Sequence, residues 1–205
     1  MSSLFSFIDL LGTFVFALSG AIAGVKKGFD LFGIFVVSTV TAVGGGVIRD
    51  LCLSATPPVG LENIEYLGAV ILAIICVSYF QKKILSLSGI SNFLDAIGLG
   101  FFAAFGANKT WHMTGSIQLA IILGCITAVG GGCIRDVLTG RPPLIFQAEI
   151  YASAAIVGAS IELLGSMGVI SPLLSPWLAI IACIVIRMLA IKYNLKLPFI
   201  NNKCF

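Results

Sequence analysis

Two copies of one decapeptide organise this chain: TAVGGGVIRD at residues 41–50 and TAVGGGCIRD at residues 127–136. Nine of the ten positions are identical, and the copies lie 86 residues apart. The similarity extends outward without a gap, because residues 7–57 share 17 identities in 51 positions with residues 93–143. A biased apolar composition raises chance identities but does not produce this decapeptide twice. The chain therefore contains an internal duplication.

The composition places this duplication in a membrane. The chain has 205 residues, of which 59% are hydrophobic and 10% are charged, and its mean hydropathy is +1.10. A soluble domain carries about 25% charged residues, so these charges cannot cover a soluble fold. The composition excludes an ordinary soluble enzyme, a disordered chain and a nucleic-acid-binding protein. The net charge of +3 is too small to indicate a polyanionic partner.

Seven apolar runs are separated by short polar stretches, and most are close to the roughly 20 residues that a helix needs to cross a bilayer. They are Leu4–Val25, Leu31–Ile48, Ile64–Phe80, Ile90–Ala107, Ile117–Leu138, Ile145–Leu164 and Leu173–Ile191. Transmembrane β-strands alternate apolar and polar residues, and these runs do not. The sequence therefore predicts an all-α membrane protein with seven transmembrane helices.

The duplication divides these seven helices into a single transmembrane domain of two repeats and a remainder. Residues 1–86 and 87–172 would each hold three helices, and residues 173–205 would hold the seventh helix and a tail. Because three is odd, the second repeat must enter the membrane upside down. Inverted repeats of this kind build a permeation path or substrate site near the middle of the bilayer. We therefore expect a protein that moves a solute or ion across the membrane.

Basic residues predict the orientation, because cytoplasmic loops carry an excess of lysine and arginine. With seven helices, eight basic residues share a side with the C-terminus, whereas the opposite side has only Lys109. The eight are Lys26, Lys27, Lys82, Lys83, Arg141, Lys192, Lys196 and Lys203. This bias predicts a multi-pass protein of the plasma (inner) membrane with its N-terminus outside and its C-terminus in the cytoplasm.

The glycine triplets are the first candidate site. They are Gly44, Gly45 and Gly46 in the first copy and Gly130, Gly131 and Gly132 in the second. Each glycine costs a helix about 1 kcal/mol relative to alanine, and backbone opened in lipid lacks hydrogen-bond partners. One interpretation is that the second and fifth helices kink or unwind there and line a pore. The alternative is close helix packing, which also selects small residues.

The Arg-Asp pairs that end each decapeptide are the second candidate site. They are Arg49, Asp50, Arg135 and Asp136. Ionisable groups inside a membrane usually face the protein interior or an aqueous path. Adjacent helical residues diverge, so one interpretation is that Arg49 meets Asp136, and Arg135 meets Asp50, across the axis that relates the repeats. Alternatively, the charges line opposite pore mouths or extend to the membrane surface.

Other polar residues carry weaker predictions. Asp9 and Asp95 occupy equivalent positions near the start of two apolar runs, where a carboxylate favours the helix dipole, and a cation site is the alternative. Arg187 lies inside the last run and must find a polar partner. The six cysteines and one histidine show no metal-ligand spacing. No nucleophile–base pair is apparent, so we predict neither an enzyme nor a bound cofactor.

Two GGGxIRD motifs, each within a three-helix unit and followed by a seventh helix, resemble the prokaryotic branch of the trimeric intracellular cation (TRIC) channels. The resemblance covers nearly the whole chain and ends at the tail Tyr193–Phe205. It implies a homotrimer in the lipid membrane with an hourglass pore in each subunit. The second and fifth helices would bend at the glycine triplets, and the Arg-Asp pairs would belong to the pore.

What would cross the membrane is a monovalent cation, K⁺ or Na⁺, which is the only ligand that the resemblance implies. The alternative is a secondary transporter of a small amino acid such as glycine. An inverted repeat alone favours the transporter. The doubled motif favours the channel.

Overall fold

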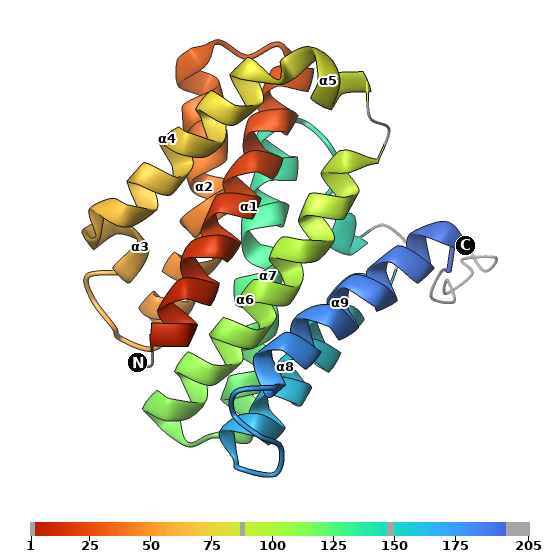
Figure 1. Ribbon diagram of the computed structural model, residues 1–205. Coiled ribbons are helices and arrows are strands. Elements are labelled where there is room, and N and C mark those ends of the chain that lie inside the picture. Colours follow the sequence, from red (N-terminus) through yellow and green to blue (C-terminus); the bar gives the residue numbers. More distant parts are fainter. Residues whose placement is uncertain (1–2, 87–88, 147–149, 196–205) are drawn as a thin grey trace, which may run out of the picture.

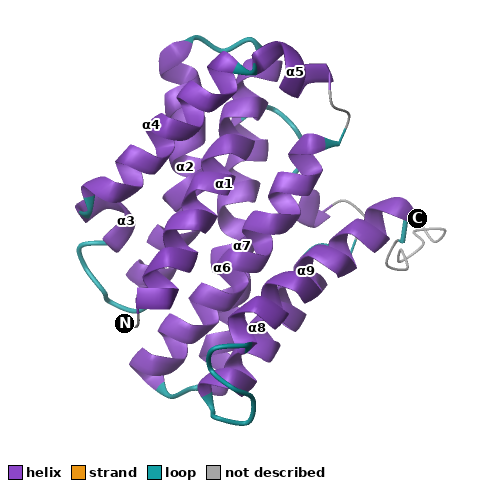
Figure 2. Cartoon of the chain, viewed as in Figure 1, coloured by secondary structure: helices purple, strands orange, loops and turns teal. Residues whose placement is uncertain are grey.

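Helices make up most of this computed structural model, which describes residues 3–86, 89–146 and 150–195. In those ranges the chain contains no strand, and Figure 2 shows helices joined by short connections. The longer helices are α1 (Ser3–Lys27), α2 (Leu31–Cys52), α4 (Ile64–Tyr79), α6 (Ile90–Thr114), α7 (Ile117–Leu138), α8 (Ala152–Ser166) and α9 (Ser175–Lys192). The short helices are α3 (Val59–Glu62), α5 (Gln81–Ser86) and the 3₁₀ helix η1 (Leu144–Phe146).

The predicted all-α membrane fold is confirmed. Five of the described helices (α1, α2, α6, α7 and α9) are long and apolar enough to cross a membrane. The apolar helices α4 and α8 are shorter, at 16 and 15 residues. The longer helices coincide with the predicted apolar runs, and the chain is a multi-pass membrane protein.

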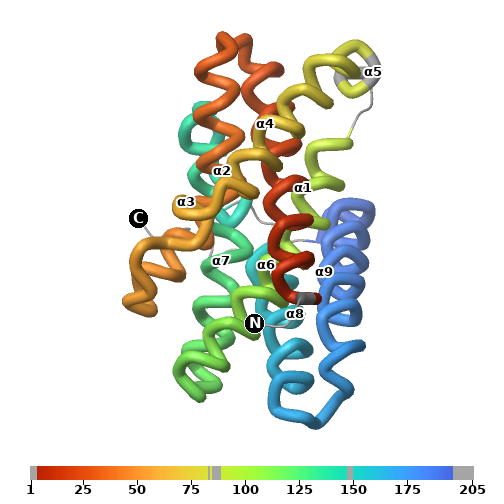
Figure 3. Tube along the Cα trace, turned by 60° about the vertical axis from the view of Figure 1, so that its left-hand side comes forward, coloured from red at the N-terminus to blue at the C-terminus, as the bar shows by residue number. Residues whose placement is uncertain are grey.

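The two copies of the duplication are built in the same way around a common centre. Helices α1 and α6 lie side by side, and α2 packs against α7 (Figure 1). Helix α4 packs on α1 and α2, whereas α8 packs on α6 and α7. Figure 3 shows α9 beside α8, on the far side of the bundle from α3. In Figure 1, α1 rises from the N-terminus and α6 descends, as an inverted second copy requires. The repeat boundaries at residues 86 and 172 stay a prediction.

The equivalent helices α2 and α7 begin with side-chain caps at equivalent positions. The side chain of Asp30 accepts a hydrogen bond from the Gly33 backbone N–H at 2.7 Å. The side chain of Ser116, 86 residues later, accepts one from the Leu119 N–H at 3.3 Å. Each cap satisfies one of the backbone donors that a helix leaves unpaired at its start.

Equivalent aromatic residues meet at the centre of the bundle. The rings of Phe16 and Phe102 lie 5.2 Å apart, and both side chains are buried. They occupy the same position in the two copies. A residue can contact its own equivalent only close to the axis that relates the copies, so this pair marks the centre of the duplication.

Two predicted helix boundaries are wrong. Helix α6 continues to Thr114 rather than ending at Ala107, because Asn108 and Lys109 are buried and hydrogen-bonded inside the protein. The sixth long helix begins at Ala152 rather than Ile145, because the chain first forms η1. Lys109 is therefore not a loop residue, and it no longer counts among the basic loop residues that predict the orientation.

Part of the orientation prediction cannot be compared with the structure. Lys196, Lys203 and the rest of the tail 196–205 lie outside the described residues, as does the Lys83 side chain.

Candidate functional site

The middle glycine of each triplet lies where α2 and α7 cross. A Cβ atom on Gly45 would lie 2.1 Å from the carbonyl oxygen of Thr127. The equivalent contact is reciprocal, since a Cβ atom on Gly131 would lie 2.0 Å from the carbonyl oxygen of Thr41. Only glycine lets the two backbones approach this closely.

Both helices remain α-helical through their triplets. The predicted unwinding is therefore wrong for this structure, because the residues on either side hold regular helix while the glycines pack against the facing helix. Close packing, the alternative interpretation, accounts for Gly45 and Gly131. A bend at the triplets stays a prediction.

The last glycine of each triplet faces polar groups instead of the crossing. A Cβ atom on Gly46 would have the Arg49 guanidinium as its nearest neighbour, at 3.7 Å. On Gly132 it would lie 3.0 Å from the Tyr151 hydroxyl and 3.3 Å from an Asp95 carboxylate oxygen. The triplets therefore combine a packing position with a position beside charged side chains.

Each Arg-Asp pair forms an ion pair with itself, so the predicted cross-axis pairing is wrong. Arg49 Nε donates to Asp50 Oδ1 at 2.8 Å, and Arg135 Nε donates to Asp136 Oδ1 at 2.9 Å. The arginine side chain is long enough to turn back to its neighbour despite the angle between adjacent helical positions. All four residues are at most 6% exposed, so they do not extend to the membrane surface.

The second carboxylate oxygen of each pair anchors the connection that follows the helix. Asp50 Oδ2 accepts a hydrogen bond from the backbone N–H of Val59 at 3.2 Å. Asp136 Oδ2 accepts one from the N–H of Leu144, also at 3.2 Å. Val59 begins α3 and Leu144 begins η1. Each aspartate thus ties its helix to the short helix beyond the prolines.

A cluster of two acids and two bases surrounds the first Arg-Asp pair, and one of the bases comes from the second copy. Lys109 Nζ, from α6, lies 2.8 Å from Asp50 Oδ1. The Arg49 guanidinium also lies over the ring of Phe105, 4.8 Å from its centroid. Asp9, from α1, accepts a hydrogen bond from the Tyr66 hydroxyl.

In the second copy, one arginine joins two acids. Arg135 Nη1 donates to Asp95 Oδ1 and to Ser19 Oγ, each at 2.7 Å, in addition to its contacts with Asp136. Asp95 and Asp9 lie inside α6 and α1 rather than at their first turns. The helix-dipole interpretation of these two aspartates is therefore wrong, and both belong to the buried charge clusters.

Two cavities lie at opposite ends of α1. The first, which we call the first mouth, has a volume of about 210 Å³ and is lined by Ser6, Asp9, Leu10, Val59, Asn63, Glu65, Tyr66, Phe105 and Lys109. The second mouth has a volume of about 260 Å³ and is lined by Ala23, Ser91, Asn92, Arg135, Asp136, Arg141, Pro142 and Leu144. At 1.5 Å per residue, Asp9 and Ala23 are separated by about 21 Å along the helix. The two mouths therefore lie near opposite ends of the bundle.

A narrow space leads inward from the first mouth. It has a volume of about 10 Å³, and its lining includes Asp9, Thr13, Gly46 and Arg49. It thus extends from the first mouth toward the crossing of α2 and α7. Polar side chains from three helices surround it.

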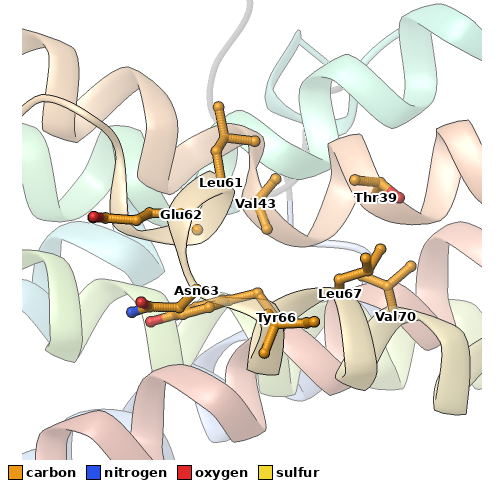
Figure 4. A pocket seen from close by; sticks show the side chains of 10 residues that line it. Thr39, Val43, Leu61, Glu62, Asn63, Tyr66, Leu67 and Val70 are labelled. Carbon is orange, nitrogen blue, oxygen red and sulfur yellow. The ribbon is translucent and has the colours of Figure 1, made fainter.

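A third cavity lies between α2, α3 and α4 and is drawn in Figure 4. Its volume is about 310 Å³, and Asn63 and Tyr66 line both this cavity and the first mouth. Leu61 and Leu67, which line it, are exposed. This cavity therefore reaches the outer surface of the bundle, and it shares Val43, Gly60 and Tyr66 with the lining of the narrow space beside Asp9 and Arg49.

Sequence reasoning missed several polar residues. The sequence placed Lys109 in a loop between two apolar runs, and it placed Tyr66 within an apolar run. Glu162, within α8, is 1% exposed and accepts hydrogen bonds from Asn108 and Ser175 at 3.0 and 2.8 Å. A charged residue within an apolar run was the signal available for Glu162. Arg187 does find partners, since it donates to the Ile150 carbonyl and lies over the Tyr151 ring.

Comparison with known proteins gives consistent matches along the chain. A family model described as glycine transporter matches residues 6–82 and 92–166. A UPF0126 membrane protein of Vibrio cholerae is 37% identical over 201 residues, covering 96% of this chain and 83% of its own. The UPF0126 inner membrane protein YadS of Escherichia coli K12 is 35% identical and covers 93% of each chain. The crystal structures of the TRIC channel orthologue from Rhodobacter sphaeroides match with a TM-score of 0.89 and 30% identity, over 95% of this chain and all of theirs.

The fold and the two mouths define the class, which is a multi-pass membrane protein with the TRIC cation-channel fold. The chain belongs to the family that the matching model describes as glycine transporter, the prokaryotic relatives of the TRIC channels.

Proposed function

We propose that this protein is a passive channel for monovalent cations, including K⁺, with one pore in each subunit of a homotrimer. The observation that carries the proposal is the pair of polar mouths on opposite faces of the bundle, each adjoining a buried cluster that contains two aspartates. Carboxylates beside a cavity favour cations over anions. The similarity to a trimeric cation channel supports the same function and assembly.

In this proposal the crossing of α2 and α7 forms the constriction between the mouths. Gly45 and Gly131 bring the two backbones into contact there. A small sliding or bending motion of these helices would open or close the path, because the middle glycines bring backbone against backbone there. The Arg-Asp pairs hold the adjoining connections in place at each mouth, and conduction needs no cofactor besides the permeant ion.

We also propose that the protein lies in the plasma membrane with the first mouth outside and the second mouth facing the cytoplasm. Lys26 and Lys27 at the end of α1, Lys82 on α5 and Arg141 in the second mouth support this orientation, since the end of α1 and α5 lie together at one end of the bundle (Figure 1). The burial of Lys109 in an ion pair removes the basic residue that opposed it.

Recording from purified protein in planar bilayers tests the channel function. In a KCl gradient, the reversal potential should follow the K⁺ equilibrium potential, and currents should occur in discrete unitary steps. A reversal potential that follows Cl⁻ would exclude this function. Chemical crosslinking of the protein in native membranes should stop at a trimer.

The description of the matching family favours one second candidate, a transporter of a small amino acid such as glycine. A transporter predicts saturable glycine uptake into proteoliposomes without unitary currents. Uptake of radiolabelled glycine and bilayer currents, measured on the same preparation, separate the two functions.

A further inference from the structure

The third cavity connects the outer surface of the bundle with the ion path of the proposed channel. Leu61, Ile64 and Leu67 line it and are 63%, 80% and 42% exposed. Exposed apolar side chains that lie together in this way mark a membrane-facing surface. At the inner end, Tyr66 lines this cavity, the narrow space and the first mouth. The cavity is therefore a lateral opening that ends one side chain away from the path.

This cavity extends into the bundle along α4. Its lining on this helix runs from Ile64, the first residue of α4, to Val70, which is a length of about 9 Å at 1.5 Å per residue. Thr39 and Val43 of α2 form the facing wall. The volume of about 310 Å³ lies at the lower end of the range for small-molecule sites, about 300–1,000 Å³. The cavity therefore suits one alkyl chain better than the two chains of a phospholipid.

The two sides of the cavity differ in polarity. Glu62 and Asn63 lie on one side, and Leu67 and Val70 lie on the other (Figure 4). Glu62 is exposed, and it is the one charged side chain among the described residues that line the cavity. An acidic rim beside an apolar wall is complementary to a molecule with a cationic head and an apolar chain, and it repels an anionic headgroup.

The inner end of the cavity stops an apolar chain short of the ion path. A Cβ atom on Gly60 would lie 3.1 Å from the Val43 Cβ atom, so α3 approaches α2 closely there. The narrow space, at about 10 Å³, is no larger than about one water molecule. A chain in the cavity therefore ends against Tyr66, whose hydroxyl donates a hydrogen bond to Asp9.

We propose that the third cavity binds a single-chain cationic amphiphile from the bilayer, with its ammonium group at Glu62 and its alkyl chain between α2 and α4. The bound chain holds the Tyr66 hydroxyl on Asp9 and keeps the narrow space too small for ions, so that it inhibits conduction. This effect on current rests on the proposed channel function, whereas the binding site does not depend on conduction.

Photolabelling of the protein in lipid nanodiscs tests the site. The probe is a dodecyltrimethylammonium ion with a diazirine near the end of its chain. The label should reach the α2 and α4 residues that line the cavity. Unlabelled dodecyltrimethylammonium should compete about two- to fivefold better than dodecanol, the range expected for one exposed ion pair. Equal competition would overturn the cationic ligand, and label confined to other helices would overturn the site.

Variants separate the contributions of the chain and the head. Leu67→Trp should reduce labelling about fivefold or more, because the larger ring fills the cavity from an exposed position. Leu72→Trp, at an exposed position of α4 outside the described lining, is the matched control and should label as wild type. Glu62→Gln should abolish the preference for the charged competitor. If Leu67→Trp does not fold, Thr39→Trp fills the cavity from α2, and wild-type labelling of whichever variant folds would overturn the site.

Recording in planar bilayers tests the inhibition. Dodecyltrimethylammonium should reduce the K⁺ current with little dependence on voltage, because a cation that binds from the lipid at the rim crosses little of the membrane field. The inhibition should be lost in Leu67→Trp and kept in Leu72→Trp. An unchanged current at a concentration that saturates labelling would refute the inhibition, and equal, voltage-dependent block of both variants would refute the lateral route. A silent wild type would refute the channel function and leave the labelling decisive for the site.

Discussion

At the scale of single residues, the ion-pair partners of the two Arg-Asp pairs depend on the charged residues that lie next to each pair. The two Arg-Asp pairs are identical in sequence, and in both the arginine Nε donates a hydrogen bond to the aspartate that follows it. Their surroundings differ, because Asp50 has a second cation in Lys109, whereas Arg135 has a second acid in Asp95. Identical motifs therefore have different energetic importance in the two copies.

We predict that Arg135→Met destabilises the protein more than Arg49→Met. Removing Arg135 leaves Asp95 and Asp136 buried without their cation, and breaking a buried pair in this way costs about 3–5 kcal/mol. Removing Arg49 leaves Asp50 with Lys109, so the loss should be smaller. Unfolding monitored by tryptophan fluorescence in detergent gives the comparison, with exposed Arg141→Met as the control. Equal losses for the two buried arginines would contradict the asymmetry.

Glu162 provides a second test at this scale. Its carboxylate accepts hydrogen bonds from Asn108, Ser166 and Ser175, which join α6, α8 and the start of α9. Glu162→Ala removes the acceptor for these donors and should cost about 2–4 kcal/mol, since each buried unsatisfied group costs about 1–3 kcal/mol. Glu162→Gln keeps an amide oxygen for Asn108 and should lose less. The same unfolding assay tests both, and a milder effect of alanine than of glutamine would contradict this role.

At the scale of elements, the crossing of α2 and α7 is the central feature. Reciprocal contacts of Gly45 and Gly131 with the facing carbonyl groups bring the helices together. The caps at Asp30 and Ser116 start these helices at equivalent positions. The anchors at Asp50 and Asp136 hold the connections that follow them. The crossing is therefore a symmetric unit in which both helices are fixed at their ends and touch in the middle.

The triplet contains its own matched control for this crossing. Gly45→Ala would place a methyl group against the Thr127 carbonyl, so the helices must separate, at a cost of about 1–3 kcal/mol. Gly46→Ala has open space, with its nearest neighbour at 3.7 Å, and should leave stability unchanged or raise it through helix propensity.

Unfolding temperature and K⁺ conductance should both change in Gly45→Ala and remain near wild type in Gly46→Ala. If both variants resemble wild type, the crossing is not the constriction.

At the scale of the whole molecule, the duplication produces two mouths that face opposite sides of the bundle. The central pair Phe16 and Phe102 and the crossing glycines lie between them. Each mouth draws residues from both copies, since Lys109 of the second copy completes the first mouth. Neither copy alone therefore forms a complete pathway.

Cysteine labelling tests the orientation of the whole molecule. In a variant without the six native cysteines, Glu62→Cys on α3 should react with a membrane-impermeant maleimide in intact cells. Lys82→Cys on α5 should react only after the membrane is permeabilised, because α3 and α5 lie at opposite ends of α4 (Figure 1). The reverse pattern would place the C-terminal end of the last helix outside.

Much of the fold was predictable from the sequence, because long apolar runs in a bilayer have few alternatives to helices. The repeated decapeptide also located the buried Arg-Asp pairs and the glycine triplets. Their contacts were not predictable. Whether Arg49 meets Asp50 or Asp136 depends on distances of a few ångströms between helices, which the spacing along one helix does not determine. The limits of α6 depended on buried partners of Asn108 and Lys109 that come from other helices.

The sequence by itself determined a duplicated, all-helical membrane protein with its charges concentrated in two motifs, because hydropathy and repetition are properties of the chain alone. Only the tertiary structure decided which glycine packs, which acids share a cation, and that Lys109 enters the mouth of the other copy. These contacts join residues far apart in sequence, and they form only when the helices pack against one another.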